Sequence, residues 1–149
     1  MIRPATIADI DPIVEMARPF LDYSMFADHT QINDDDLIQA LCNLLDNGII
    51  LVAEKDSKII GALCGMMSQF WFSPKTKVAI ELGWWIQEEH RSGMSAVRLL
   101  NAFEDWAKNM GASVVSLSDL RVADDYPAGK LFNKLGYSVV ERAHLKGVH

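Results

Sequence analysis

Cysteine is scarce in this chain of 149 residues, and long apolar runs are missing. The two cysteines, Cys42 and Cys64, lie in apolar surroundings without a second cysteine or a histidine at metal-ligand spacing, which argues against a disulfide framework or a zinc site. No apolar stretch approaches the roughly 20 residues of a membrane span, and the residues after Met1 lack the apolar core of a secretion signal. We therefore expect buried thiols, no bound metal, no membrane association and a reducing, cytoplasmic location.

Positive charge is also in short supply. The chain has 14 Lys and Arg residues against 20 Asp and Glu residues, which gives a formal net charge of -6 and a pI near 5.1. A surface with this balance is not suited to neutralising many phosphates, so we expect no nucleic-acid partner. The same acidity favours the approach of a cationic molecule such as an amine, although acidic surfaces also serve solubility alone.

Apolar residues, in contrast, are abundant enough for one continuous core. They make up 50% of the chain, charged residues make up 23%, and no Pro-, Ser- or Gly-rich tract divides the sequence. We therefore expect residues 1–149 to form a single domain.

Apolar spacing predicts a series of helices and strands. Helices are predicted over residues 6–19, 33–48, 96–110 and 127–135, and strands over 49–54, 59–67, 77–86, 114–118 and 137–145. Residues 20–31 are expected to form short helical turns or loop, residues 55–58 a hairpin turn, and residues 70–74 an aromatic loop. Helices interspersed among strands indicate an α/β or α+β fold with a mixed sheet. The strand–helix–strand unit over 80–118 should be a parallel crossover with a ligand site at the carboxyl ends of its strands.

The segment between the strand that ends at Ile86 and the helix that starts at Ala96 has the character of an anion site. It is short and polar, and it contains Gly93 and two serines. The first amides of a helix lack internal partners and lie at the positive end of the dipole, so they can bind a diphosphate. The alternative is that Gly93 and Ser95 only form a turn and begin a helix.

The sequence Arg91-Ser92-Gly93-Met94-Ser95-Ala96 resembles the Gln/Arg-x-x-Gly-x-Gly/Ala motif with which the GNAT family of N-acetyltransferases binds acetyl-coenzyme A. Arg91 and Ala96 match the ends of the motif, whereas Met94 replaces its central glycine and a glycine stands one position earlier. Met94 can still donate its backbone amide if its φ is negative and if Gly93 meets any need for a left-handed turn.

The resemblance extends over nearly the whole chain. The start of the chain at residues 2–6 with Asp9 is similar to the family's first strand and helix start, and residues 51–54 with 60–61 are similar to its central hairpin. Residues 128–137 resemble the Ala-x-x-Leu-Tyr-x-Lys-x-Gly-Phe signature of its last helix and strand.

This resemblance implies a mixed, mostly antiparallel sheet with helices on both faces and a splayed parallel strand pair at the cofactor site. It implies direct transfer of an acetyl group from acetyl-CoA to an amine of a small molecule, a protein lysine or an amino terminus. The residues matched to coenzyme binding are Trp85, Ile86 and Gln87 for the pantetheine, Arg91, Ser92, Gly93, Met94, Ser95 and Ala96 for the diphosphate, and Phe132 and Lys134 on the last helix.

For catalysis, the resemblance singles out a carboxylate on the strand before the loop. Glu81 is the candidate base for the amine proton, with an outward-facing ion pair as its alternative role. Phe132 occupies the position of the family's usual tyrosine acid, so water or Tyr126 is expected to protonate the leaving thiolate. A non-catalytic acyl-CoA-binding sensor or partner-binding module is the alternative function.

The acceptor is expected beside an aromatic and acidic wall, consisting of Asp22, Tyr23, Phe26, His29, Phe70, Trp71 and Phe72. Alternatively, Phe70, Trp71 and Phe72 close one end of the core or form the contact of a homodimer.

Overall fold

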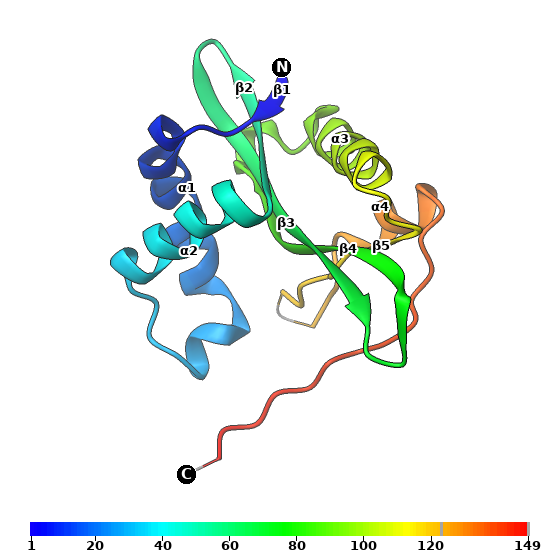
Figure 1. Ribbon diagram of the computed structural model, residues 1–149. Helices are drawn as coiled ribbons and strands as arrows, with labels where there is room; N and C mark the ends of the chain where they lie inside the picture. Colours follow the sequence, from blue (N-terminus) through cyan, green and yellow to red (C-terminus); the bar gives the residue numbers. More distant parts are fainter. Residues whose placement is uncertain (123, 149) are drawn as a thin grey trace.

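The computed structural model describes residues 1–122 and 124–148 and is built on a mixed sheet (Figure 1). Within these residues the sheet has five strands in the order β1-β2-β3-β4-β5. Their bounds are Ile2–Pro4 for β1, Ile49–Lys55 for β2, Lys58–Phe70 for β3, Ser73–Ile86 for β4 and Val114–Ser116 for β5. The first four strands pair antiparallel, and β5 pairs parallel to β4, which confirms the predicted mixed sheet.

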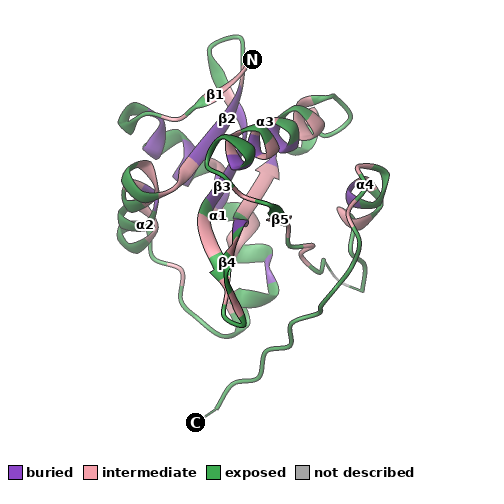
Figure 2. Ribbon diagram, turned by 45° about the vertical axis from the view of Figure 1, so that its right-hand side comes forward, coloured by how far each residue is buried: buried purple, intermediate pink, exposed green. Residues whose placement is uncertain are grey.

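Helices cover both faces of this sheet (Figure 1). The α-helices are α1 (Ile10–Tyr23), α2 (Asp34–Asn47), α3 (Ser95–Asn109) and α4 (Gly129–Lys134), and the short 3-10 helices are η1 (Ile7–Asp9), η2 (Met25–Asp28) and η3 (Glu88–His90). Alternate residues of β2 divide between the two faces, with Val52 packed among residues of α1 and α2 and Leu51 among residues of α3. Figure 2 shows the buried residues concentrated on the central strands and on the inner sides of the helices.

Local sequence explains the clearest elements. Asn33 caps α2, because its side-chain oxygen accepts hydrogen bonds from the Asp35 and Asp36 amides at 2.8 and 3.3 Å. The hairpin between β2 and β3 turns at Asp56 and Ser57, whose φ values of 50° and 60° match the two-residue turns that fit the twist of paired strands.

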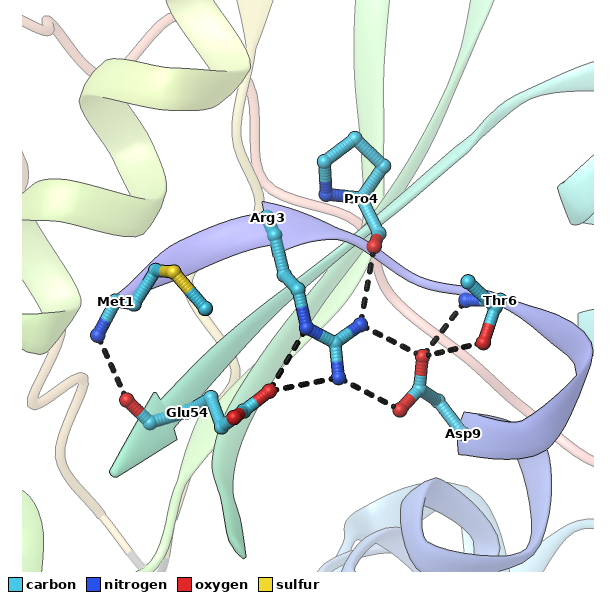
Figure 3. Close-up of polar contacts among 6 residues, drawn as sticks. All are labelled: Met1, Arg3, Pro4, Thr6, Asp9 and Glu54. Carbon is cyan, nitrogen blue, oxygen red and sulfur yellow. Dashed lines mark hydrogen bonds and ion pairs between the residues drawn. The ribbon is translucent and has the colours of Figure 1, made fainter. Parts of the chain in front are cut away.

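An ion-pair network joins the start of the chain to the sheet (Figure 3). Arg3 donates to both carboxylate oxygens of Asp9 at 2.8 and 2.9 Å, and its Nε donates to Glu54 Oε2 at 2.8 Å. The Asp9 carboxylate also accepts from the amide and the hydroxyl of Thr6. These bonds fix β1 against β2 and set the position at which α1 begins.

The first helix is longer than predicted. It continues through Pro19 to Tyr23, whereas we expected it to end near Pro19. Proline removes one backbone donor, but Pro19 is exposed, so the carbonyl that it leaves unpaired can bind water. Beyond Pro19 the helix is held by Phe20, whose ring stacks on Trp85 with 6.3 Å between centroids.

The predicted aromatic loop at 70–74 is a hairpin tip instead. Strand β3 extends to Phe70 and β4 begins at Ser73, so only Trp71 and Phe72 lie between them. The rings of Phe70 and Phe72 stack with 5.1 Å between centroids, which continues the strand pairing to the end of the hairpin. Two other elements are shorter than predicted. Strand β5 ends at Ser116, two residues early, and α4 covers Gly129–Lys134 instead of 127–135.

The predicted last strand over 137–145 is wrong. Residues 138–148 are exposed and form no strand (Figure 2, green). The alternating pattern favours an extended conformation, but a strand also requires a neighbouring strand to satisfy its backbone groups, and no described residue supplies one.

None of the helices in the described ranges is long and apolar enough to cross a membrane.

Candidate active site

The site begins where β4 and β5 part. Their parallel pairing runs from Val78 opposite Val114 to Ile80 opposite Ser116 and then stops. At the same point β4 contains a bulge, because Glu81 lies opposite Gly65 and Gly83 lies opposite Cys64, which leaves Leu82 without a partner on β3. The bulge and the divergence together leave one edge of β4 open beyond Glu81.

Backbone groups on this open edge are available to a ligand. The Gln87 amide donates to the Ile60 carbonyl of β3 at 2.9 Å, so the amide and carbonyl of Ile86 point to the opposite side, where β5 has diverged. The alternation of the antiparallel ladder gives Trp84 the same orientation. Of the three residues predicted to pair with the pantetheine, Ile86 therefore directs its backbone into the gap, and Trp85 directs its backbone to β3. The Gln87 amide also points to β3, whereas the Gln87 carbonyl accepts from the His90 amide at 2.9 Å.

Glu81 is a buried ionisable residue at the point where β4 and β5 diverge. Its side chain is 4% exposed, and its Oε2 accepts a hydrogen bond from the Ser118 amide at 2.9 Å. Desolvation raises the pKa of Glu81 to about 7, and the Ser118 hydrogen bond opposes this shift only in part. No ion pair within residues 1–122 and 124–148 includes Glu81, so the alternative role in an outward-facing salt bridge is excluded there. A carboxyl group with this pKa can accept a proton near neutral pH.

Two neighbouring tryptophans face opposite sides of the sheet. Trp84 lies against Phe132 of α4, with 5.7 Å between ring centroids, and Trp85 lies against Phe20 of α1. The indole Nε1 of Trp85 is buried and has no hydrogen-bond partner among the described residues. Because a buried donor is costly to leave unpaired, a bound molecule that accepts from this nitrogen would be stabilised.

The loop before α3, for which we predicted an anion site, presents unpaired backbone amides. Arg91 Nε donates to the Ile86 carbonyl at 2.9 Å and thereby ties the loop to the end of β4. Along the described chain, the amides at the first turn of α3, from Met94 to Val97, have no hydrogen-bond acceptor, and no side chain caps the helix. These amides and the dipole of a 15-residue helix suit a diphosphate.

Met94 fits this loop without strain. Its φ is -83°, and Gly93 also has no positive φ, so this loop does not need the left-handed turn that Gly93 could have provided. A glycine is therefore not required at either position by the backbone.

The remaining residues predicted for the site lie on the C-terminal segments. Phe132 is buried between Trp84 and Tyr137, and Lys134 is exposed in the last turn of α4. Tyr126 is 38% exposed with the Arg142 guanidinium 5.6 Å from its ring, and no described contact joins it to Glu81.

The predicted acceptor wall separates into two groups in the structure. Phe70, Trp71 and Phe72 form one cluster at the hairpin tip, and Tyr23 and Phe26 lie exposed around η2. No described ring contact joins the two groups, so their common role as an acceptor wall remains a prediction.

Sequence reasoning missed two residues that follow β5. Ser118 binds Glu81 through its amide, and Asp119 lies against the start of α4 with its Oδ1 buried and unpaired among the described residues. Burial raises the pKa of the Asp119 carboxyl, and hydrogen bonds from the Ala128 and Gly129 amides oppose the shift. The sequence signal was only their place just after a strand of the crossover, where ligand sites are common.

The geometry fits one class of ligand. A buried carboxyl with a pKa near neutrality, an open strand edge and a row of unpaired helix amides follow one another along β4 and the start of α3, an arrangement that suits an extended thioester with a diphosphate. The part of the chain that the structure describes holds no cluster of three His, Cys, Asp or Glu residues suited to a metal ion.

Comparison with known proteins agrees with this geometry. Residues 13–137 match the model of the acetyltransferase (GNAT) family, and the chain belongs to this family. It is an acetyl-CoA-dependent N-acetyltransferase, which transfers an acetyl group to an amine.

Solved structures with low sequence identity share the fold. An aminoglycoside 6'-N-acetyltransferase from Acinetobacter haemolyticus has 18% identity and a TM-score of 0.76, with 100% of this chain and 98% of that chain covered. A predicted acetyltransferase from Clostridium acetobutylicum, solved with acetyl-CoA, has 18% identity and a TM-score of 0.76 over 98% and 95% of the two chains. A ribosomal-protein-alanine N-acetyltransferase from Brucella melitensis has 15% identity and a TM-score of 0.75 over 99% of each chain. Curated protein sequences give no match.

Proposed function

We propose that Glu81 is the general base that removes the proton from the attacking amine. The observation that supports this role is its burial at the divergence of β4 and β5, with a single amide partner and a pKa of about 7. A base of this pKa is half ionised near neutral pH and can take a proton directly or through one water.

In the reaction that we propose, the amine nitrogen attacks the thioester carbonyl, the C–N bond forms and the C–S bond breaks. The amine proton passes to Glu81, and the leaving thiolate takes a proton from water or from Tyr126. A thiol has an ordinary pKa of about 8.5, so the thiolate is a good leaving group and Phe132 need not supply a proton. The products are the N-acetylated amine and free coenzyme A.

The coenzyme is proposed to lie along the open edge of β4. The Ile86 amide would pair with the pantetheine, and the amides that start α3, in the segment Arg91 to Ala96, would hold the diphosphate. Trp85 and Gln87 would contribute through side chains rather than backbone amides. Phe132 would contact the pantetheine beside Trp84, and Lys134 would approach the phosphates as an exposed cation.

The proposed acceptor is a small cationic amine. A net charge of -6 favours the approach of a cation, and the structural relatives include aminoglycoside N-acetyltransferases. Another structural relative is a ribosomal-protein-alanine N-acetyltransferase, so a peptide with an amino-terminal alanine is the substrate to compare with the small amines.

Thiol release tests both the base and the acceptor class. Purified enzyme with acetyl-CoA would be given an aminoglycoside, a linear polyamine and a peptide with amino-terminal alanine, and each amine would be tested with wild type, Glu81→Gln and the exposed control Glu88→Gln. We expect release with at least one small cationic amine, loss of release in Glu81→Gln and wild-type rates in Glu88→Gln.

Equal rates in wild type and Glu81→Gln would contradict the role of Glu81. Release with the peptide alone would contradict the proposed acceptor class. A calorimetric titration with acetyl-CoA checks that each variant still binds the coenzyme.

We also propose that residues 1–149 act as one acyltransferase domain in the cytoplasm. The continuous five-stranded sheet and the free thiols of Cys42 and Cys64 are compatible with both statements. Fluorescence microscopy of a tagged chain would test the location.

A further inference from the structure

The tip of the β3–β4 hairpin, residues 70–72, carries aromatic side chains that the proposed reaction does not use. Trp71 is 89% exposed and Phe72 is 66% exposed. The Phe72 ring stacks on Phe70 and meets the Trp71 ring edge-on, with 5.5 Å between the last two centroids. Figure 1 shows the hairpin (green) reaching away from the helices that cover the sheet, and Figure 2 shows its end exposed. Exposed aromatic side chains that lie this close together are typical of a contact surface.

The tip lies far from the proposed base. Trp71 follows six residues after Gly65, which lies opposite Glu81. A strand rises about 3.3 Å per residue, so the tip lies roughly 20 Å from Glu81 along the sheet. A small amine that reacts at Glu81 does not extend this far, and the tip is therefore available for a different contact.

A bulge in β4 places positive charge next to the aromatic rings. Strand β3 pairs with Ser73 and then with Lys77, so residues 74–76 bulge out of the hairpin. The hydroxyl oxygens of Ser73 and Thr76 lie 2.9 Å apart and close the bulge. Lys75 lies in the bulge, and both Lys75 and Lys77 are exposed and form no ion pair with any described residue. The hairpin therefore combines aromatic rings with ammonium groups at one end.

The positive charge of the hairpin contrasts with the rest of the chain. The chain has 20 acidic and 14 basic residues, yet no Asp or Glu occurs between Asp56 and Glu81, a stretch that contains three lysines. The remainder of the molecule is therefore more acidic than the net charge of -6 for the whole chain. Near a negatively charged surface, a molecule with this asymmetry turns its hairpin toward the surface and its acidic remainder away from it.

We propose that the tip of the β3–β4 hairpin docks on the anionic surface of a lipid bilayer. Tryptophan and phenylalanine favour the layer between water and hydrocarbon, and anionic headgroups attract basic side chains beside them. A bilayer also suits the shape of the tip, because a projecting tip needs no matching pocket there, whereas a protein partner must supply one. We expected no membrane association because no apolar stretch is long enough to span a membrane, but surface docking needs no such stretch. The contact is peripheral and reversible, since so few side chains anchor it.

Flotation with lipid vesicles tests this docking. The full chain is mixed with vesicles of phosphatidylcholine and phosphatidylglycerol in equal parts, or of phosphatidylcholine alone, at low and at high salt. We expect binding to the anionic vesicles that weakens at high salt, because salt screens the attraction of the lysines. Trp71→Ser should lower the partition coefficient by about tenfold or more, because it removes the largest inserted ring. Lys75→Glu should also lower it about tenfold, because it reverses one charge.

Two exposed residues away from the tip supply matched controls. Ile7→Ser changes an apolar side chain on η1 that is 70% exposed, and Lys55→Glu reverses an exposed charge at the end of β2. Both variants should bind the vesicles as wild type does. Because Trp71 and Lys75 are exposed, their replacement should not unfold the chain, and urea midpoints followed by circular dichroism check this.

Quenching by brominated lipids identifies the part of the chain that touches the bilayer. Vesicles with brominated acyl chains should quench the tryptophan fluorescence of wild type. Trp71→Phe keeps an aromatic ring at the tip, so it should still bind but lose most of this quenching.

Absence of wild-type binding to the anionic vesicles would overturn the proposal. Equal binding of wild type and Trp71→Ser, or equal quenching of wild type and Trp71→Phe, would overturn it as well. A wild type that stays off the vesicles, but self-associates in ultracentrifugation and loses this association in Trp71→Ser, would assign the tip to a second copy of the chain instead.

Discussion

Two buried carboxylates of this molecule, Asp9 and Glu81, have opposite environments. Asp9 is 7% exposed and accepts two hydrogen bonds from Arg3 and two from Thr6, and the Arg3 guanidinium holds its pKa well below the usual range (Figure 3). Glu81 is 4% exposed, but among the described residues it has one amide partner and no cation, and desolvation raises its pKa to about 7.

The difference indicates what each acid is for. A buried charge with a full set of partners holds elements together, and Asp9 lies where β1, α1 and β2 meet. A buried carboxyl that is left with little compensation costs stability, and such groups concentrate at active sites. The four predictions that follow test this contrast between a structural acid and the acid that we propose to be catalytic.

The largest expected effect is on catalysis. Glu81→Gln keeps an oxygen that can accept the Ser118 hydrogen bond but cannot take a proton, so kcat should fall by about 10²- to 10⁴-fold. Steady-state thiol release with the best amine acceptor measures the loss. The matched change at the other acid, Asp9→Asn, should leave the kcat of the folded enzyme within about threefold of wild type. Similar losses in both variants would remove the contrast.

The second effect concerns the structural acid. Arg3→Met leaves the Asp9 carboxylate buried without its cation and should lower the free energy of unfolding by about 3 kcal/mol. Urea denaturation followed by tryptophan fluorescence measures the change. Arg18→Met is the control, because Arg18 pairs with the exposed residues Asp22 and Asp34 and should contribute at most about 1 kcal/mol. Equal losses of unfolding free energy in Arg3→Met and Arg18→Met would show that the burial of Asp9 does not strengthen its ion pair.

The third effect is the cost of burying Glu81. Its folded pKa of about 7 lies above its ordinary value of 4.5, so the folded state holds this proton more tightly than the unfolded state does. The stability that the proton contributes is therefore complete below about pH 4.5 and is lost as the pH rises through about 7. Glu81→Gln carries no such titration and should gain about 2 kcal/mol in unfolding free energy over wild type between roughly pH 5 and roughly pH 8. Urea midpoints at the two pH values measure the gain. A constant difference would contradict the raised pKa.

The smallest effect separates the base from the coenzyme loop. Arg91→Met removes the hydrogen bond to the Ile86 carbonyl and should raise KM for acetyl-CoA about three- to tenfold, because one hydrogen bond of a charged group is lost. The kcat and its pH dependence should stay close to wild type. A shift of the kinetic pKa in Arg91→Met would mean that the loop and Glu81 are coupled.

Much of the fold could be predicted because local signals agreed with tertiary packing. The helical spacing of Leu99, Leu100, Phe103 and Ala107 identified α3, and all four residues are buried in the core. The hairpin of β2 and β3 was equally clear. Pro19 misled the prediction of α1, because the stack of Phe20 on Trp85 outweighed the local preference of proline.

The site could be predicted only in part. The loop from Arg91 to Ala96 has a local motif, whereas the surroundings of Glu81 depend on where β4 and β5 diverge. The bulge at Leu82 has no sequence signal, and Ser118 lies far from Glu81 in the chain. The segment 137–145 has the pattern of a strand, but no described residue pairs with it.

The pH dependence of kcat/KM tests the role of Glu81 most directly. It should be measured with an amine acceptor whose own pKa lies well above 7, for wild type and for Glu81→Gln. We predict that wild type gains activity with a slope of one up to an apparent pKa near 7, and that Glu81→Gln lacks this transition. A wild-type profile without a transition near pH 7, or the same transition in Glu81→Gln, would contradict the assignment of Glu81 as the base.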